Sequence, residues 1–126
     1  MSERGALITI GGREYELLLT TKATKEIAGR YGGLDHLGDK LMKSENFEMA
    51  LSEIVWLITL LANQSILVHN ITDKEHPKEL LTEDEVEILT SPFGLAGYKA
   101  AITAAMYAGT KRNVESEEDS KNAQVG

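Results

Sequence analysis

The most continuous apolar stretch of the chain runs from residue 47 to residue 68. Its centre, residues 54–62, is apolar on every face of a helix, and such a helix lies either inside a protein or in a membrane. Crossing a membrane takes about 20 mostly apolar residues, whereas here Glu53 precedes the apolar centre and polar residues 63–65 follow it. We therefore predict a buried central helix over 47–68, with the other elements packed around it.

Residues 6–19 show the alternation of a β-hairpin. Gly11 and Gly12 can both adopt positive φ, as a two-residue primed turn requires. That turn fixes the register, so that the mostly apolar face carries the pairs Ile10/Arg13, Ile8/Tyr15 and Ala6/Leu17, and the mostly polar face carries Thr9/Glu14 and Leu7/Glu16. A lone hairpin is marginally stable in water. Its apolar face must therefore pack on the helices, or its edge must pair with another chain.

Two helices are predicted between the hairpin and the central helix. Thr20 or Thr21 can cap the first, over residues 21–31. Gly32-Gly33 ends it, because glycine readily adopts the left-handed cap conformation. A short helix over 34–42 follows. The residues that share one face of the first helix are Ala23, Ile27 and Tyr31.

After the central helix, a polar loop over 69–78 leads to two more helix starts. Thr82 and Glu85 form a capping box for a short helix over 83–89, with Val86 and Leu89 facing inward. Ser91-Pro92 begins a last, Ala-rich helix over 92–108, because proline is well placed at the first helical position. On this last helix one side carries Phe93, Ala96, Ala100 and Tyr107, flanked by Ile102 and Met106.

Residues 110–126 are dominated by Glu, Asp, Ser, Lys and Asn. Such a segment cannot offset the entropy lost on its own ordering, so we predict a disordered acidic tail. Residues 1–109 then form a single domain, a length sufficient for one core. The predicted fold is mainly α with an N-terminal β-hairpin (α+β), a small helical bundle around the buried central helix.

Composition narrows the classes of function. The 126 residues carry a formal net charge of −7, with a pI of about 4.9, which argues against nucleic acid as the main partner. The chain has no cysteine, which excludes disulfides, thiolate metal sites and a cysteine nucleophile. The N-terminus has no basic segment followed by an apolar one, so we expect no signal peptide, no membrane partner and a cytoplasmic protein.

No group of residues forms a convincing catalytic site. His69 and His76, with Asp73 and Glu75 between them, offer ligands for zinc, but their spacing matches no zinc motif and a solvated polar loop explains them. The acidic run 83–87 lies at a helix start, where the helix dipole accounts for it. The glycines form no phosphate-binding loop. We therefore expect no enzyme activity, no cofactor and no metal.

Several segments, taken in their order over residues 6–108, resemble a known family. They are Ile8-Thr9-Ile10-Gly11-Gly12-Arg13-Glu14-Tyr15-Glu16-Leu17, Thr20-Thr21-Lys22-Ala23, Glu26-Ile27, Tyr31-Gly32-Gly33-Leu34, the apolar helix around Trp56, and Leu81-Thr82-Glu83-Asp84-Glu85-Val86. This pattern resembles the tail assembly chaperones of long-tailed phages and of prophages in Gram-positive bacteria. The resemblance rests on overall pattern and order, without a catalytic signature.

The resemblance implies a mostly helical, non-enzymatic protein in the cytoplasm of a bacterial host. Such chaperones bind the tape measure protein, keep it soluble and help to recruit tail tube subunits to it during virion morphogenesis. They are often made in two lengths, the longer by a programmed frameshift.

For this chain we expect the helix-in-groove mode of binding, in an apolar groove between the last helix and the central one. The partner-binding candidates are Phe93, Tyr98, Ile102 and Met106; the alternative is that these residues simply close the core. We also expect self-association into an oligomer, through the hairpin edge or the last helix.

Other classes of protein stay open. A different small phage structural protein, such as a head-tail connector component, would form a ring and bind portal or tube. A helical regulator should show a basic recognition helix, and none is visible. A metal-dependent enzyme would depend on His69 and His76.

Overall fold

The computed structural model describes residues 5–33 and 47–109. In chain order these residues form β1 (Gly5–Ile10), β2 (Arg13–Leu18), α1 (Thr21–Tyr31), α3 (Phe47–Thr72), α4 (Glu83–Leu89) and α5 (Pro92–Gly97), and residues 99–109 are helical after a turn at Tyr98. The predicted fold class, mainly α with an N-terminal two-stranded antiparallel hairpin, is confirmed. The helix predicted over 34–42 and the tail predicted over 110–126 lie outside the described residues.

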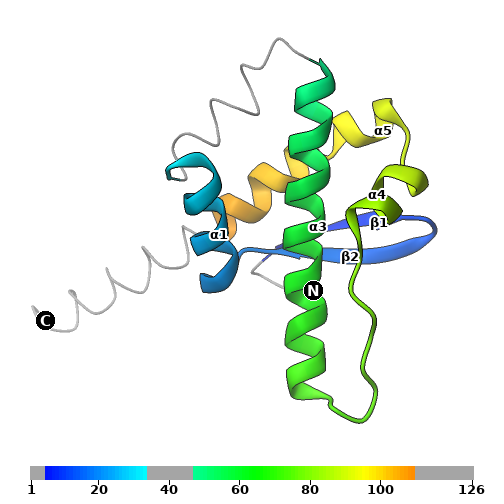
Figure 1. Cartoon of the computed structure of the whole chain (residues 1–126). Helices are drawn as coiled ribbons and strands as arrows, with labels where there is room; N and C mark the ends of the chain where they lie inside the picture. The colour runs from blue at the N-terminus through cyan, green and yellow to red at the C-terminus, as the bar shows by residue number, and fades with distance from the viewer. Residues whose placement is uncertain (1–4, 34–46, 110–126) are drawn as a thin grey trace, which may run out of the picture.

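Helix α3 is the axis of the fold (Figure 1). It has 26 residues, and four of its apolar side chains, Ile54, Leu57, Ile58 and Leu61, are completely buried. The hairpin crosses α3, α1 lies on one side of it, and α4 and α5 lie on the other. The prediction of a buried central helix is therefore confirmed, although the helix continues to Thr72 instead of ending near Val68.

The segment Leu51–Thr72 is also long and apolar enough to cross a membrane by length and composition alone. Half of its most apolar window is buried against the rest of the protein. The core helix of a globular fold passes the same test, so this feature does not by itself indicate a membrane span.

The hairpin has the register that its turn predicts. Ile10 pairs with Arg13, Ile8 with Tyr15 and Ala6 with Leu17. Gly11 and Gly12 both have positive φ, 58° and 80°, which only glycine adopts at little cost. Ile8, Ile10 and Leu17 are buried, whereas Leu7 on the other face is 55% exposed. The apolar face of the hairpin thus packs on the helices, which is the first of the two alternatives that the sequence left open.

A polar cluster joins α1 to α3. The Arg30 guanidinium donates to the Glu53 carboxylate at 2.9 Å and lies 4.3 Å from the centre of the Trp56 ring. The hydrogen bond to Glu53 raises the pKa of Arg30, and burial raises the pKa of the neighbouring Tyr31 hydroxyl. At the other end of α1, the Thr20 cap donates to Gln64 on α3. Both ends of α1 are therefore anchored on the central helix.

The last helix differs from the prediction of one continuous helix over 92–108. The Tyr98 N–H bonds to the Leu95 carbonyl three residues back, at 3.0 Å, which tightens the chain into a turn. The Tyr98 hydroxyl donates to the Thr9 carbonyl at 2.6 Å, so this turn is held on β1. The inward side of the two helical pieces consists of Leu95, Ile102 and Ala105.

Candidate functional site

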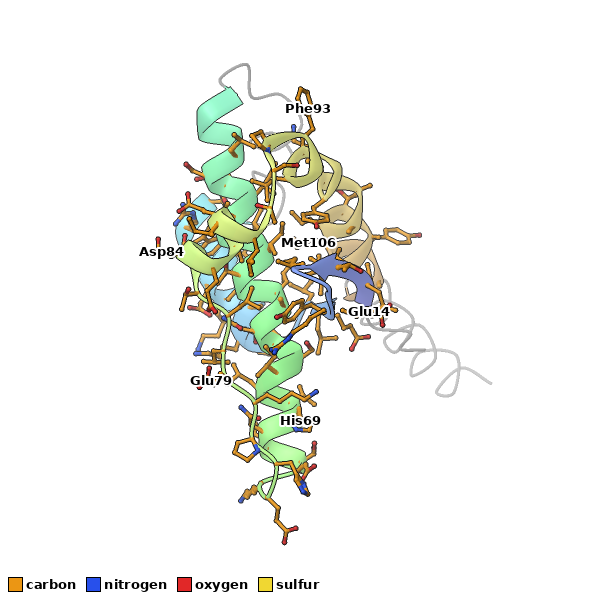
Figure 2. The ribbon with its side chains drawn as sticks, turned by 90° about the vertical axis from the view of Figure 1, so that its right-hand side faces the viewer. Glu14, His69, Glu79, Asp84, Phe93 and Met106 are labelled. Atoms are coloured by element: carbon orange, nitrogen blue, oxygen red, sulfur yellow. The ribbon has the colours of Figure 1, made fainter. Side chains whose placement is uncertain are left out.

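The four predicted partner-binding residues do not gather on one surface. Ile102 is completely buried, and Met106 and Tyr98 are half-buried against the core. Phe93 is 90% exposed at the start of α5. Figure 2 shows Phe93 at one end of the molecule and Met106 near the hairpin. Because Ile102 and Ala105 fill the space beside α3, the groove that we expected there is packed with side chains in this structure.

The opposite side of the last helix forms the first candidate surface. A hollow of about 680 Å³ lies along it, and we call this surface the terminal-helix face; it is lined by Ala96, Gly97, Lys99, Ala100, Thr103, Ala104 and Tyr107. Tyr107 is 64% exposed, and Phe93 lies one helical turn before Gly97. Small side chains allow another helix to approach closely, and aromatic side chains are enriched at protein interfaces. This face can therefore accept an apolar helix.

The corner between α4 and α5 also exposes apolar side chains. Val86 is completely buried, as predicted, but Leu89, which we expected to face inward, is 52% exposed. Its methyl groups lie close to the hairpin turn at Gly11, which covers only part of the side chain. Ile88 is 82% exposed. The exposure of Leu89 could not be predicted, because a helix of seven residues, Glu83–Leu89, is too short for its periodicity to determine which face is buried.

The second candidate surface is a groove of about 790 Å³ beside β2, here called the β2 groove. Its walls are residues 13–16 of β2 and residues 78–79 of the segment that follows α3, and Leu7 lies at its margin. Its floor is the C-terminal part of α3, through Ser65, Ile66 and His69. Figure 2 labels Glu14 on the hairpin and His69 on α3, two of the residues that line this groove.

Two asparagines hold the far wall of the β2 groove in place. The Asn63 side chain donates to the Leu81 carbonyl at 2.8 Å and accepts from the Leu81 N–H at 2.7 Å. Asn70, seven residues on and so on the same side of α3, makes the same pair of bonds with Lys78, at 3.0 and 2.8 Å. Each amide thus satisfies both backbone groups of one residue in an extended segment.

The two histidines of this segment take separate roles. The His69 Nε2 lies 2.7 Å from the His76 carbonyl oxygen, a contact that requires the proton on Nε2. The His76 Nδ1 lies 3.1 Å from the Asp73 carboxylate. Within residues 5–33 and 47–109, no group of three or more His, Asp and Glu side chains is arranged to hold a metal ion.

Comparison with known proteins adds no relative. The chain matches no family model, no curated protein and no solved structure. The sequence pattern and the two surfaces described above are therefore the features that bear on function.

Proposed function

We propose that this protein is a phage tail assembly chaperone without enzymatic activity. It binds the tape measure protein, keeps it soluble and helps to recruit tail tube subunits to it. The family resemblance of residues 6–108 supports the proposal, and the mainly α fold is compatible with it. The structural observation that carries it is the exposed apolar terminal-helix face, next to the exposed Phe93.

The binding mechanism is the burial of an apolar helical stripe. A long helical partner lays its apolar side chains against Ala96, Ala100 and Ala104, where the absence of large side chains lets the two helices approach. Tyr107 lines one end of the contact, and the exposed Phe93, one helical turn before Gly97, extends it at the other with a second aromatic side chain. The net charge of −7 keeps a partner coated with many copies soluble.

The first experiment is a tagged pull-down from cells that express the native gene cluster, read by mass spectrometry. The proposal expects a very long helical protein in the eluate, together with tail tube subunits. Portal or capsid proteins in its place would favour the alternative, a head-tail connector component, and would overturn the chaperone function.

A pair of variants locates the binding surface in the same assay. Ala100→Glu places one charge in the middle of the terminal-helix face, at an exposed position that leaves the core untouched. Thr21→Glu adds the same charge at an exposed position of α1 and serves as the control. We expect Ala100→Glu to lose the long partner and Thr21→Glu to retain it. Equal recovery by both variants would show that the terminal-helix face is not the binding surface.

A further inference from the structure

The two edges of the hairpin are unlike each other. In an antiparallel pair, successive residues point their backbone groups alternately toward the partner strand and away from it. The two-residue turn closes with Ile10 and Arg13 bonded to each other, so Glu14 and Glu16 of β2 direct their N–H and C=O groups outward. Thr9, opposite Glu14, does the same on β1, and there its carbonyl accepts the Tyr98 hydroxyl.

In the part of the chain that the structure describes, the β1 edge is thus covered at Thr9, whereas the β2 edge pairs with no further strand. The last helix lies along β1 at Tyr98. Among the described residues, β2 pairs only with β1 in a two-stranded sheet. Its outer edge faces the β2 groove, whose floor is the C-terminal part of α3. In Figure 1 the hairpin crosses α3 with β2 on the side of that C-terminal part. An added strand would therefore cross the same helix that the hairpin crosses.

We propose that the β2 groove binds an extended peptide segment of a partner protein, which adds to β2 as a third strand and carries basic residues alternating with apolar ones. Main-chain hydrogen bonds to Glu14 and Glu16 would hold the segment, as in other cases of strand addition. This site is separate from the terminal-helix face and does not depend on the chaperone function.

The negative charges of Glu14 and Glu16 favour basic residues in the bound segment. Glu14 and Glu16 project on one face of β2, two residues apart, and side chains of an adjacent strand lie about 4.5–5.5 Å from such neighbours. Lysine or arginine there forms opposite-charge pairs. On the other face, Arg13 lies at the turn end of the groove, and the alternate residues of the segment beyond it meet Tyr15 and the Ile66 floor, which favour apolar side chains. Lys78 and Glu79 on the far wall carry opposite charges, and so they contribute little net preference.

The same charges disfavour a second copy of this chain as the occupant. A copy that paired through its own β2 in an antiparallel manner would bring its Glu14 and Glu16 beside the first pair. Like charges directly opposite each other destabilise a strand pair, and charged residues on an edge strand are a common protection against edge-to-edge association.

The probe is a fluorescein-labelled synthetic peptide of about ten alternating lysine and valine residues, long enough to span a strand. Fluorescence anisotropy with the full chain should show saturable binding, weakened about tenfold when glutamate replaces lysine, because favourable cross-strand pairs become unfavourable. A third peptide has the same sequence with alternate backbone nitrogens methylated on the bonding side. It keeps the charge but cannot form the ladder, and we expect it not to bind. Equal binding of the methylated peptide would mean general attraction to an acidic protein and would overturn the proposal.

Two double variants place the site. Glu14→Lys with Glu16→Lys should reverse the preference, so that the glutamate-valine peptide binds more tightly. Glu26→Lys with Glu87→Lys makes the same change of net charge at exposed positions of α1 and α4, and should leave the preference as it is. Circular dichroism checks that both double variants are folded. Unchanged preference in the first double variant would place the peptide elsewhere.

Amide hydrogen exchange in the unmodified chain measures directly whether β2 forms main-chain hydrogen bonds with the peptide. Addition of the lysine-valine peptide should protect the outward amides of Glu14 and Glu16. If those amides are already protected in a dimer that the peptide does not dissociate, the groove is occupied by a second copy and the proposal is wrong.

Discussion

The two halves of α3 are held in the fold by different kinds of interaction. Around Leu57 and Ile58, apolar side chains from the hairpin, α1, α4 and the last helix pack on the helix and bury these two side chains completely. Beyond Asn63, Gln64 accepts from the Thr20 cap and Ile66 lies beside β2. Among the described residues, the 73–82 segment then runs along the end of the helix (Figure 1). That segment is held on the helix by paired amide hydrogen bonds, from Asn63 to Leu81 and from Asn70 to Lys78.

This difference has consequences for both stability and function. Apolar burial is non-directional and contributes to the free energy of unfolding in proportion to the buried area. The first half of α3, here called the packed half, therefore determines global stability. The paired hydrogen bonds of Asn63 with Leu81 and of Asn70 with Lys78, which we call the amide clamps, are directional. They determine where a particular piece of backbone lies. The clamped half is also the half that forms the floor and far wall of the β2 groove. The fold thus uses packing for stability and specific hydrogen bonds to shape a surface.

The largest expected effect is in the packed half. Ile58→Ala removes a completely buried side chain from the centre of the core. The expected loss in the free energy of unfolding is about 2–5 kcal/mol, because the transfer term and the remaining cavity both contribute. Chemical denaturation followed by circular dichroism measures it. Ile71→Ala, at a 71% exposed position of the same helix, is the control and should change stability by less than about 0.5 kcal/mol. Similar losses in the two variants would contradict the contrast between the halves.

An intermediate effect is expected at the boundary of the two halves. Asn63→Ala leaves the N–H and C=O of Leu81 without the bonds that Asn63 makes at 2.7 and 2.8 Å. Leu81 is buried, so water reaches these groups poorly, and we expect a loss of about 1–3 kcal/mol. Asn63→Asp keeps the acceptor for the Leu81 N–H but loses the donor, and it should fall between the wild-type protein and Asn63→Ala in the same denaturation experiment. A variant as stable as wild type would mean that the clamp contributes nothing to folding.

The packed half is also the part that the sequence predicted. The alternation over residues 6–19 and the Gly11-Gly12 turn determine the hairpin register, and an apolar run without a polar face determines the burial of α3. Both signals depend only on residues that are close together in the sequence. The capping box at Thr82 and Glu85 is local as well, and the structure contains it as predicted.

The clamped half and both candidate surfaces depend on contacts between distant residues. The bond from Tyr98 to Thr9 joins residues 89 positions apart, and it marks the break in the last helix that periodicity could not reveal. The Ala-rich last helix offers apolar residues on several sides, so its pattern did not decide that Ile102 faces inward while Phe93 is exposed. One signal was available: Asn63 and Asn70 are seven residues apart, and two amides on one side of an apolar helix indicate a polar partner there.

We expect the smallest effect on global stability at Asn70. This position also gives the sharpest test of the difference between the two halves of α3. Its bonds to Lys78 have the same form as those of Asn63 to Leu81, but Lys78 is exposed, so water can replace them. Asn70→Ala should therefore lower the free energy of unfolding by only about 0.5–1 kcal/mol. Locally the effect should be clear, because the segment loses one of its two amide clamps. Amide exchange should become faster at Lys78 and remain unchanged at Ile58. If exchange at Ile58 accelerates equally, the two halves unfold as one unit, and the amide clamps are part of the core's cooperativity.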